Sequence, residues 1–382
     1  MYKIGTLNKI SQTGLACFSD KYAVSDDVAG TNGILVRSQD MHEMEFGREL
    51  LSIARAGAGV NNIPLDRCAE EGIVVFNTPG ANANAVKELV LAGMLLAARN
   101  IPAGIAWANT LTENIGKAVE KGKSQFAGTE LRGKTLGVVG LGAIGVLVAN
   151  AACDLGMKVI GYDPYFSIKS AHSLYSCVDV KNDIKALLPL CDYISIHVPA
   201  MDSTKGMFNA ELFGLMKDNA VLLNFSRDKL VNEPDLLAAL AEGKPAKYVT
   251  DFPTDNVLGK DGVICLPHLG ASTAEAEDNC ASMAALQTMD YIENGNIVNS
   301  VNFPAVSLGE RTADNRICVL TKGEPNPLKL ASAMFSDINI KAVAGNVRGE
   351  YGYALISTDE QITSVPKVDG VIKVRVIQPD EA

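Results

Sequence analysis

Three short polar segments of this 382-residue chain each follow a run of apolar residues that is typical of a buried strand. The first contains Arg227, the second contains Asp251 and Asp255, and the third contains His268. An arginine can bind a carboxylate through two parallel hydrogen bonds, and a histidine beside a carboxylate is a common general acid and base. These residue types predict a site that binds an organic acid and moves a proton.

A glycine motif lies between two further apolar runs. Gly140 permits a tight turn after the first run, Gly142 lets the backbone approach a pyrophosphate, and Gly145 allows close helix–strand packing. Asp163 ends the second run, at the spacing of an acid that accepts hydrogen bonds from ribose hydroxyls and disfavours a 2′-phosphate. The pattern predicts a dinucleotide site that binds NAD.

The remaining histidines and the cysteines carry little further chemistry. Of the four histidines, His268 is our candidate for catalysis, and we expect His197 at the sheet edge or against the cofactor. The eight cysteines are scattered without a C-x-x-C pair, so we expect reduced and mostly buried thiols. No pair of histidines or cysteines has ligand spacing, and we expect no metal site.

Composition indicates a folded protein, because 47% of the residues are apolar and only 20% are charged. The length favours two or three domains. The net charge of −10 offers no basic surface for nucleic acid. The sequence contains no uninterrupted run of about 18 apolar residues, which would indicate a membrane-spanning helix. We therefore expect a cytoplasmic protein that binds neither nucleic acid nor membrane.

Strand-like and helix-like runs alternate along most of the chain, which predicts an α/β fold with two doubly wound parallel sheets. The expected strands lie at 33–36, 52–54 and 73–76 in a first layer, and at 136–139, 158–162, 193–198, 220–224 and 263–266 in a second. After an irregular linker near 300–313, the last part reads strand, helix and three strands. That order predicts a small α+β module at the C-terminus.

Taken together, these segments resemble the D-2-hydroxyacid dehydrogenase family over essentially the whole chain. Besides the glycine motif, the resemblance is carried by residues 55–60 (RAGAGV), 197–199 (HVP), 224–227 (NFSR) and 267–273 (PHLGAST). It implies a Rossmann cofactor domain, residues 96–271, inserted in a flavodoxin-like substrate domain made of residues 1–95 and 272–301. The active site would lie between these two domains.

The resemblance also implies residue roles. Arg227 would bind the substrate carboxylate and carbonyl, and His268 would exchange the hydroxyl proton. The family places a glutamate beside this histidine; Asp255 stands at that position, with Asp251 as the alternative, and Asp228 replaces the usual glycine after the arginine. Residues expected at the cofactor are Gly140, Gly142, Ala143, Ile144, Gly145, Asp163, His197, Val198, Pro199, Ser226, Asp251 and Gly270.

Residues expected at the substrate are Arg37, Ser38, Ala58, Gly59, Val60 and Asn82. They match the branch of the family that acts on a phosphorylated 2-hydroxy acid, and Arg37 would supply the cation that a phosphate dianion needs. We therefore expect NAD-dependent oxidation of 3-phospho-D-glycerate to 3-phosphohydroxypyruvate, a step of serine biosynthesis. Two alternatives stay open: a hydroxypyruvate or glyoxylate reductase, and a non-catalytic NAD-sensing protein.

Residues 314–382 resemble an ACT domain. Thr321 and Gly323 stand where that domain has the histidine and asparagine that contact an amino acid. We therefore expect the module to assemble subunits rather than to mediate amino-acid feedback. Residues 101–131 resemble the family's dimerisation region, and a homodimer or homotetramer is expected.

Overall fold

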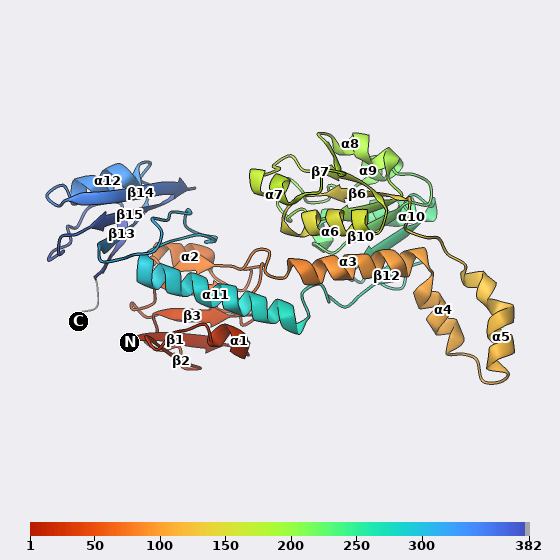
Figure 1. The fold of residues 1–382 in the computed structure, drawn as a ribbon, viewed down its shortest axis with the longest axis horizontal. Coiled ribbons are helices and arrows are strands. Elements are labelled where there is room, and N and C mark those ends of the chain that lie inside the picture. The colour runs from red at the N-terminus through yellow and green to blue at the C-terminus, as the bar shows by residue number, and fades with distance from the viewer. Residues whose placement is uncertain (379–382) are drawn as a thin grey trace. The chain divides into compact units, whose positions relative to one another are not determined.

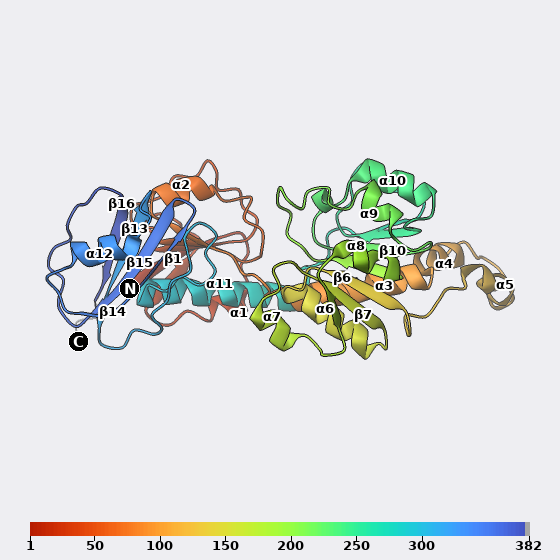
Figure 2. The ribbon, with the colours of Figure 1, turned by 90° about the horizontal axis from the view of Figure 1, so that it is seen from above.

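The computed structural model describes residues 1–378, which divide into two compact units (Figures 1 and 2). One unit comprises Met1–Ala81 and the chain from Ala274 onward, and the other comprises Asn82–Thr273. The first boundary lies before α3 (Ala83–Ala98), whereas we expected it at 95/96. The reason is packing, because Gly93 on α3 lies directly against the Phe225 ring of the second unit.

The N-terminal unit contains a parallel sheet of five strands in the order β2-β1-β3-β4-β5. Its strands are β1 (Tyr2–Leu7), β2 (Tyr22–Ser25), β3 (Gly33–Val36), β4 (Ser52–Arg55) and β5 (Val74–Phe76). Its helices are α1 (Gln12–Leu15), α2 (Leu65–Glu70) and the long α11 (Ala274–Asn294). Strand order reverses between β1 and β3, and ligands of such sheets bind beyond the carboxyl ends of the strands at that reversal.

The second unit contains a parallel sheet of seven strands in the order β12-β11-β10-β9-β6-β7-β8. The strands are β6 (Thr135–Val139), β7 (Lys158–Tyr162), β8 (Asp179–Lys181), β9 (Tyr193–Ile196), β10 (Val221–Asn224), β11 (Lys247–Thr250) and β12 (Val263–Cys265). Apolar cores cover both faces of this sheet. Strand order reverses between β6 and β9, so the glycine motif after β6 lies at the binding edge. The predicted α/β fold class is confirmed.

Helices surround this second sheet. They are α3, α4 (Ile101–Ala108), α5 (Ile115–Gly122), α6 (Ala143–Asp154), α7 (Ile168–Ser173), α8 (Ile184–Leu187), α9 (Ala210–Gly214) and α10 (Glu233–Ala241), with 3₁₀ turns at Lys123–Phe126, Leu188–Leu190 and Asp228–Leu230. α4 and α5 extend away from the sheet (Figure 1) and expose Ile105 by 57% and Ile115 by 54%. Dimerisation through this segment stays a prediction.

Of the helices in residues 1–378, none alone is long and apolar enough to cross a membrane. α3 and α4 meet the length and hydropathy criteria only as a pair, and the chain bends by 66° between them.

The C-terminal module is an antiparallel sheet of four strands in the order β14-β15-β13-β16, an ACT-like arrangement. Its elements are β13 (Asn315–Lys322), α12 (Pro327–Met334), β14 (Ile340–Arg348), β15 (Tyr351–Thr358) and β16 (Val371–Ile377). α12 covers one face of the sheet, and the other face joins the core beneath α11. Residues 379–382, at the end of the expected ACT-like domain, lie outside the described residues.

Hydrogen bonds from two side chains, Arg375 and Tyr353, join this module to the rest of the N-terminal unit. The Arg375 guanidinium donates hydrogen bonds to the carbonyls of Tyr291 and Ile292 at the end of α11, and it lies 4.6 Å from the Tyr291 ring centre. The Tyr353 hydroxyl donates to the Gly295 carbonyl at 2.6 Å. The module is therefore an integral part of this unit's core.

Candidate active site

The glycine turn after β6 leaves no room for side chains at two of its three glycines. Gly140 has φ +98, and a Cβ there would lie 2.6 Å from the His197 carbonyl oxygen. A Cβ on Gly145 would overlap the Gly140 carbonyl group. Gly142 differs, because a Cβ there would meet no atom within 4 Å. The space beside Gly142 is therefore open to a ligand.

The start of α6 is built to receive an anion. Gly142 occupies its N-cap position, and no side chain caps the first turn in this structure. The first N–H groups of a helix have no intrahelical acceptor, and they carry partial positive charge. Ala143 and Ile144 are the first residues of that turn, where a diphosphate would bind. The turn therefore offers donors without a protein acceptor.

Asp163 directly follows β7 and is half-buried. One carboxylate oxygen accepts from the Leu141 N–H and the other from the Tyr165 N–H, both at 2.8 Å. A carboxylate has about four acceptor positions, so capacity for a ribose diol remains. The open space at Gly142, the uncapped helix and the oriented carboxylate fit a dinucleotide.

His197 follows β9, next to the glycine turn. Its backbone N–H donates to Val139, and its Nε2 lies 2.8 Å from the Ser195 hydroxyl. The Nδ1 atom is buried and has no partner among the described residues. Burial lowers the pKa of this imidazole to about 3, so the ring is neutral. A neutral ring with an unpaired nitrogen fits a contact to cofactor better than proton transfer, and Val198 and Pro199 continue along the same edge.

The loop after β10 is held by hydrogen bonds to the side chain of Asn224, which is fully buried. Its amide donates to the Arg227 carbonyl at 2.8 Å, and its side-chain oxygen accepts from the N–H groups of Ser226 and Arg227. The Ser226 hydroxyl donates to the Ile196 carbonyl at 2.7 Å. The backbone that carries Arg227 is therefore fixed, while its guanidinium is exposed.

Arg227, Phe252 and His268 form a row at the binding edge. The Arg227 guanidinium carbon lies 5.5 Å from the centre of the Phe252 ring, and the centres of the Phe252 and His268 rings lie 4.6 Å apart. His268 is exposed and has φ +53, a conformation that is uncommon for residues other than glycine. The structure thus brings together the guanidinium and the imidazole that the sequence singled out.

Of the two candidate carboxylates, Asp251 is the one that lies near this row. It is 1% exposed, and its Oδ2 accepts from the Gly270 N–H at 2.9 Å. Its Oδ1 is buried without a partner among residues 1–378. Burial raises the pKa of Asp251, while the Gly270 N–H and the charges of His268 and Arg227 oppose this rise. Asp251 therefore interacts electrostatically with both ends of the row.

Asp255 is exposed, and within the described part of the chain it makes no hydrogen bond or ion pair. The loop that carries it is tied to α10, because Glu233 accepts from Thr254 and Asn256, each at 2.7 Å. Counting along the family pattern selected Asp255, but the fold turns that residue toward solvent. This difference makes Asp251 the better candidate for the partner of His268.

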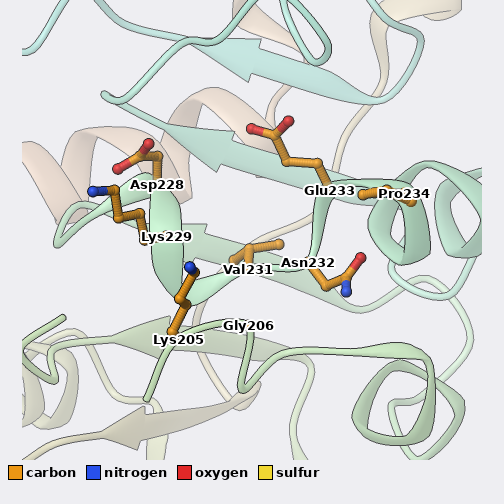
Figure 3. A pocket seen from close by; sticks show the side chains of 8 residues that line it. All are labelled: Lys205, Gly206, Asp228, Lys229, Val231, Asn232, Glu233 and Pro234. Atoms are coloured by element: carbon orange, nitrogen blue, oxygen red, sulfur yellow. The ribbon is translucent and has the colours of Figure 1, made fainter. Parts of the chain in front are cut away.

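A cavity of about 350 Å³ lies beside the residues that follow Arg227 (Figure 3). Two lysines, Lys205 and Lys229, and two carboxylates, Asp228 and Glu233, contribute to its lining. The lining therefore carries both cationic and anionic side chains. Asp228, which stands where the family usually has a glycine after the arginine, thus lines this cavity.

The N-terminal unit holds a second group of polar residues where its strand order reverses. Asn8 follows β1 with φ +67, and its side-chain oxygen accepts from the N–H groups of Ser38 and Gln39 at 2.8 and 2.7 Å. Sequence reasoning missed Asn8, because strand β1 before it, which polar residues interrupt, was not recognised. Asparagine is among the few residues that adopt positive φ readily, and this was the available signal.

Arg37 lies beside this loop and already has a carboxylate partner. Its guanidinium is 2.7 Å from Glu277 on α11, with the two side chains 41% and 43% exposed. The Arg55 Nε donates to the Arg37 carbonyl at 3.0 Å, which fixes the Arg37 backbone. The cation that we expected for phosphate is present, but it is neutralised by Glu277 in this structure.

The other expected substrate residues fall in both units. Ala58, Gly59 and Val60 form the loop after β4, where the Asn77 amide donates to the Ala58 carbonyl at 2.7 Å. Asn82 belongs to the second unit and precedes α3 without a capping hydrogen bond from its side chain. Among residues 1–378, no three His, Cys, Asp or Glu side chains gather as a metal site.

Comparison with known proteins defines the class of this chain. Residues 91–270 match the family model described as D-isomer specific 2-hydroxyacid dehydrogenase, NAD binding domain. The chain is 32% identical over 364 residues to the D-3-phosphoglycerate dehydrogenase of Haemophilus influenzae, which covers 90% of this chain and 86% of that protein. This chain belongs to the D-isomer specific 2-hydroxyacid dehydrogenase family. The predicted family and the predicted cofactor, NAD, are confirmed.

A second relative is the D-3-phosphoglycerate dehydrogenase of Methanocaldococcus jannaschii, 36% identical over 321 residues. The match covers 80% of this chain but only 59% of that protein, so the chain spans about three fifths of the relative's length. Among solved structures, the NAD⁺-bound 3-phosphoglycerate dehydrogenase of Entamoeba histolytica is similar with a TM-score of 0.62 and 26% identity. That similarity covers 79% of this chain and 98% of the other.

Proposed function

We propose that this protein is an NAD-dependent dehydrogenase of D-2-hydroxy acids and that its substrate is 3-phospho-D-glycerate, which it oxidises to 3-phosphohydroxypyruvate. The observation that carries the proposal is the row of Arg227, Phe252 and His268, with the buried Asp251 hydrogen-bonded to the N–H of Gly270, two residues after His268. The relatives named D-3-phosphoglycerate dehydrogenase support the choice of substrate.

In this proposal Arg227, His268 and Asp251 each have one task. The Arg227 guanidinium binds the substrate carboxylate through paired hydrogen bonds and fixes its orientation. His268 accepts the proton of the substrate hydroxyl. Asp251 stabilises the positive charge that His268 then carries. The chemistry that bound NAD supplies is acceptance of the hydride from substrate carbon 2, and Gly142, Asp163 and His197 are the residues that would hold it.

Phosphate recognition is assigned to the polar group in the N-terminal unit. Arg37 supplies a cation, and the loop of Ser38 and Gln39 is held in place by Asn8. Substrate phosphate would have to replace Glu277 as the partner of Arg37. A dianion offers more charge than one carboxylate, and both side chains are half-exposed, so this exchange is feasible.

The ion pair between Arg37 and Glu277 also favours a second candidate function. A carboxylate at this position repels phosphate, and an unphosphorylated acid would not need to displace it. Reduction of hydroxypyruvate or glyoxylate is therefore the alternative.

The test is NADH consumption by the purified protein with 3-phosphohydroxypyruvate, hydroxypyruvate and glyoxylate, with NADPH as the cofactor control. We expect kcat/KM to be highest for the phosphorylated acid with NADH. Higher values for the smaller acids would move the protein to the reductase alternative. Absence of turnover with all three, together with retained NADH binding, would instead favour the NAD-sensing protein.

Two histidine variants test which residue transfers the proton. We expect His268→Gln to lose turnover by about 10²- to 10⁴-fold, because general acid–base catalysis contributes that much, and to keep NADH affinity. The matched control is His172→Gln, since His172 is an exposed histidine in α7. Equal turnover of the two variants would rule out the role of His268.

A further inference from the structure

Two cysteines outside the candidate active site lie with their sulfur atoms 2.8 Å apart. Cys153 is on α6 and is half-buried, whereas Cys177 precedes β8 and is exposed. The Cys177 thiol donates to the Cys153 sulfur. The sulfur atoms of a disulfide are about 2.05 Å apart, so bond formation requires a movement of less than about 1 Å.

The segment that carries Cys177 is held against α6 on both sides of the pair. Asn150 lies almost one helical turn before Cys153, and its amide nitrogen donates to the Ser173 carbonyl at 2.8 Å. Its side-chain oxygen accepts from the Tyr175 N–H at 2.9 Å. Val178 is buried in the same apolar core as α6. The proximity of the two sulfurs therefore follows from a braced backbone.

Five of the other six cysteines offer a contrast, and the sixth, Cys265, is half-buried. Cys68, Cys191, Cys280 and Cys318 are buried. Cys17 is half-buried like Cys153, but its thiol donates to the Thr13 carbonyl at 3.5 Å. Our expectation of mostly buried thiols therefore does not hold for the pair of Cys153 and Cys177.

We propose that Cys153 and Cys177 form a redox-active pair, which hydrogen peroxide converts to an intramolecular disulfide. Cys177 attacks one peroxide oxygen as thiolate, the O–O bond breaks, and a sulfenic acid and hydroxide form. The hydroxide takes up the proton that the Cys177 thiol released and leaves as the first water. The Cys153 sulfur then attacks the Cys177 sulfur, the S–O bond breaks, and the second water leaves with the Cys153 proton. Two thiols lose two electrons in total, and the peroxide is reduced.

Exposure sets the order of these steps. The thiolate is the reactive form, and an oxidant in solution reaches the exposed Cys177 first. Burial, followed by the hydrogen bond from Cys177, raises the pKa of Cys153 to about 12, so Cys153 stays protonated until the sulfenic acid has formed. Cys177 is thus the primary site of oxidation and Cys153 the resolving thiol.

The disulfide would fix the segment before β8 without reaching the dinucleotide turn. Cys153 lies ten residues after Ala143, the first residue of α6, which at a rise of about 1.5 Å per residue is roughly 15 Å along the helix. We expect oxidation to leave NADH affinity unchanged and to raise the melting temperature by a few degrees, because the cross-link restricts the unfolded chain.

The experiment treats the reduced 382-residue protein with hydrogen peroxide, blocks the remaining thiols and digests with trypsin without reductant. The expected product joins the peptide of residues 135–158, which contains Cys153, to the peptide of residues 170–181, which contains Cys177. Reduction with dithiothreitol before digestion should separate the two peptides and return the melting temperature to its starting value.

Three variants make the result specific. Cys153→Ser should leave Cys177 to proceed to sulfinic acid, Cys177→Ser should leave Cys153 unmodified, and the control Cys17→Ser should form the disulfide as the wild type does. Absence of the linked peptides in the wild type would overturn the proposal. A linked product with a lower melting temperature would also overturn it, because the reduced geometry would then not suit the bond.

Discussion

Substitution of two glycines in the same turn should separate packing from ligand binding. In Gly145→Ala the new methyl group would lie within 3.0 Å of the Gly140 carbonyl carbon and still closer to its oxygen. Both are backbone atoms of the turn, so α6 must move away from β6. In Gly142→Ala the methyl group meets no protein atom within 4 Å, and φ −78 suits alanine.

The magnitudes follow from these geometries. Overpacking at Gly145 costs about 1–3 kcal/mol, and the helix propensity of alanine returns up to about 1 kcal/mol. At the upper end of the overpacking cost the net loss is about 2 kcal/mol, which should lower the melting temperature by roughly 4–8 °C for a unit of this size. Gly142→Ala should melt within about 2 °C of the wild type, because the N-cap cost and the reduced freedom of the unfolded chain nearly cancel.

Thermal unfolding without ligand and fluorescence titration with NADH measure the two effects. Gly145→Ala should lose both stability and NADH affinity. Gly142→Ala should lose NADH affinity alone, because its methyl group occupies the space that the pyrophosphate needs. The reasoning is refuted if Gly145→Ala melts like the wild type, or if Gly142→Ala binds NADH with unchanged affinity.

Two further substitutions test the polar groups. Burial raises the pKa of Asp251, so its protonated form stabilises the fold below the unfolded pKa of about 4, and this contribution is lost as the pH rises through the folded value. Between pH 4 and pH 8 the unfolding free energy, measured in urea, should therefore fall less for Asp251→Asn than for the wild type. The turnover of the variant should be lower than that of the wild type. A steeper fall of the unfolding free energy in the variant would contradict the assignment. Asn8→Ala removes the acceptor of two backbone N–H groups, worth about 1–2 kcal/mol, and should raise KM for the phosphorylated acid by roughly 5- to 30-fold at unchanged kcat. An equal rise in KM of Asn8→Ala for hydroxypyruvate would exclude a role in phosphate binding.

Local signals in the sequence predicted much of the fold. The strands at Gly33–Val36 and Lys158–Tyr162 were predicted with the bounds that the structure has. These strands are short apolar runs, and such runs are a property of neighbouring positions. β1 and β11 were missed, because polar residues interrupt both strands: Lys3 and Thr6 in β1, and Lys247 and Thr250 in β11.

The sequence by itself determined the dinucleotide turn, because Gly140 needs a positive φ, Gly145 has no room for a Cβ beside the Gly140 carbonyl, and Gly142 leaves space for a ligand. It also singled out Arg227 and His268, because polar residues after buried strands collect at one edge of a parallel sheet. These inferences need only the direction of the chain and the order of its elements.

Only the tertiary structure decided which groups meet. It turned Asp255 to solvent and buried Asp251 against the Gly270 N–H, although counting along the chain had favoured Asp255. It paired Arg37 with Glu277, and it brought the sulfur atoms of Cys153 and Cys177 together. The physical reason is that such contacts join residues far apart in sequence, and their geometry depends on how helices and loops pack on the sheets rather than on any local pattern.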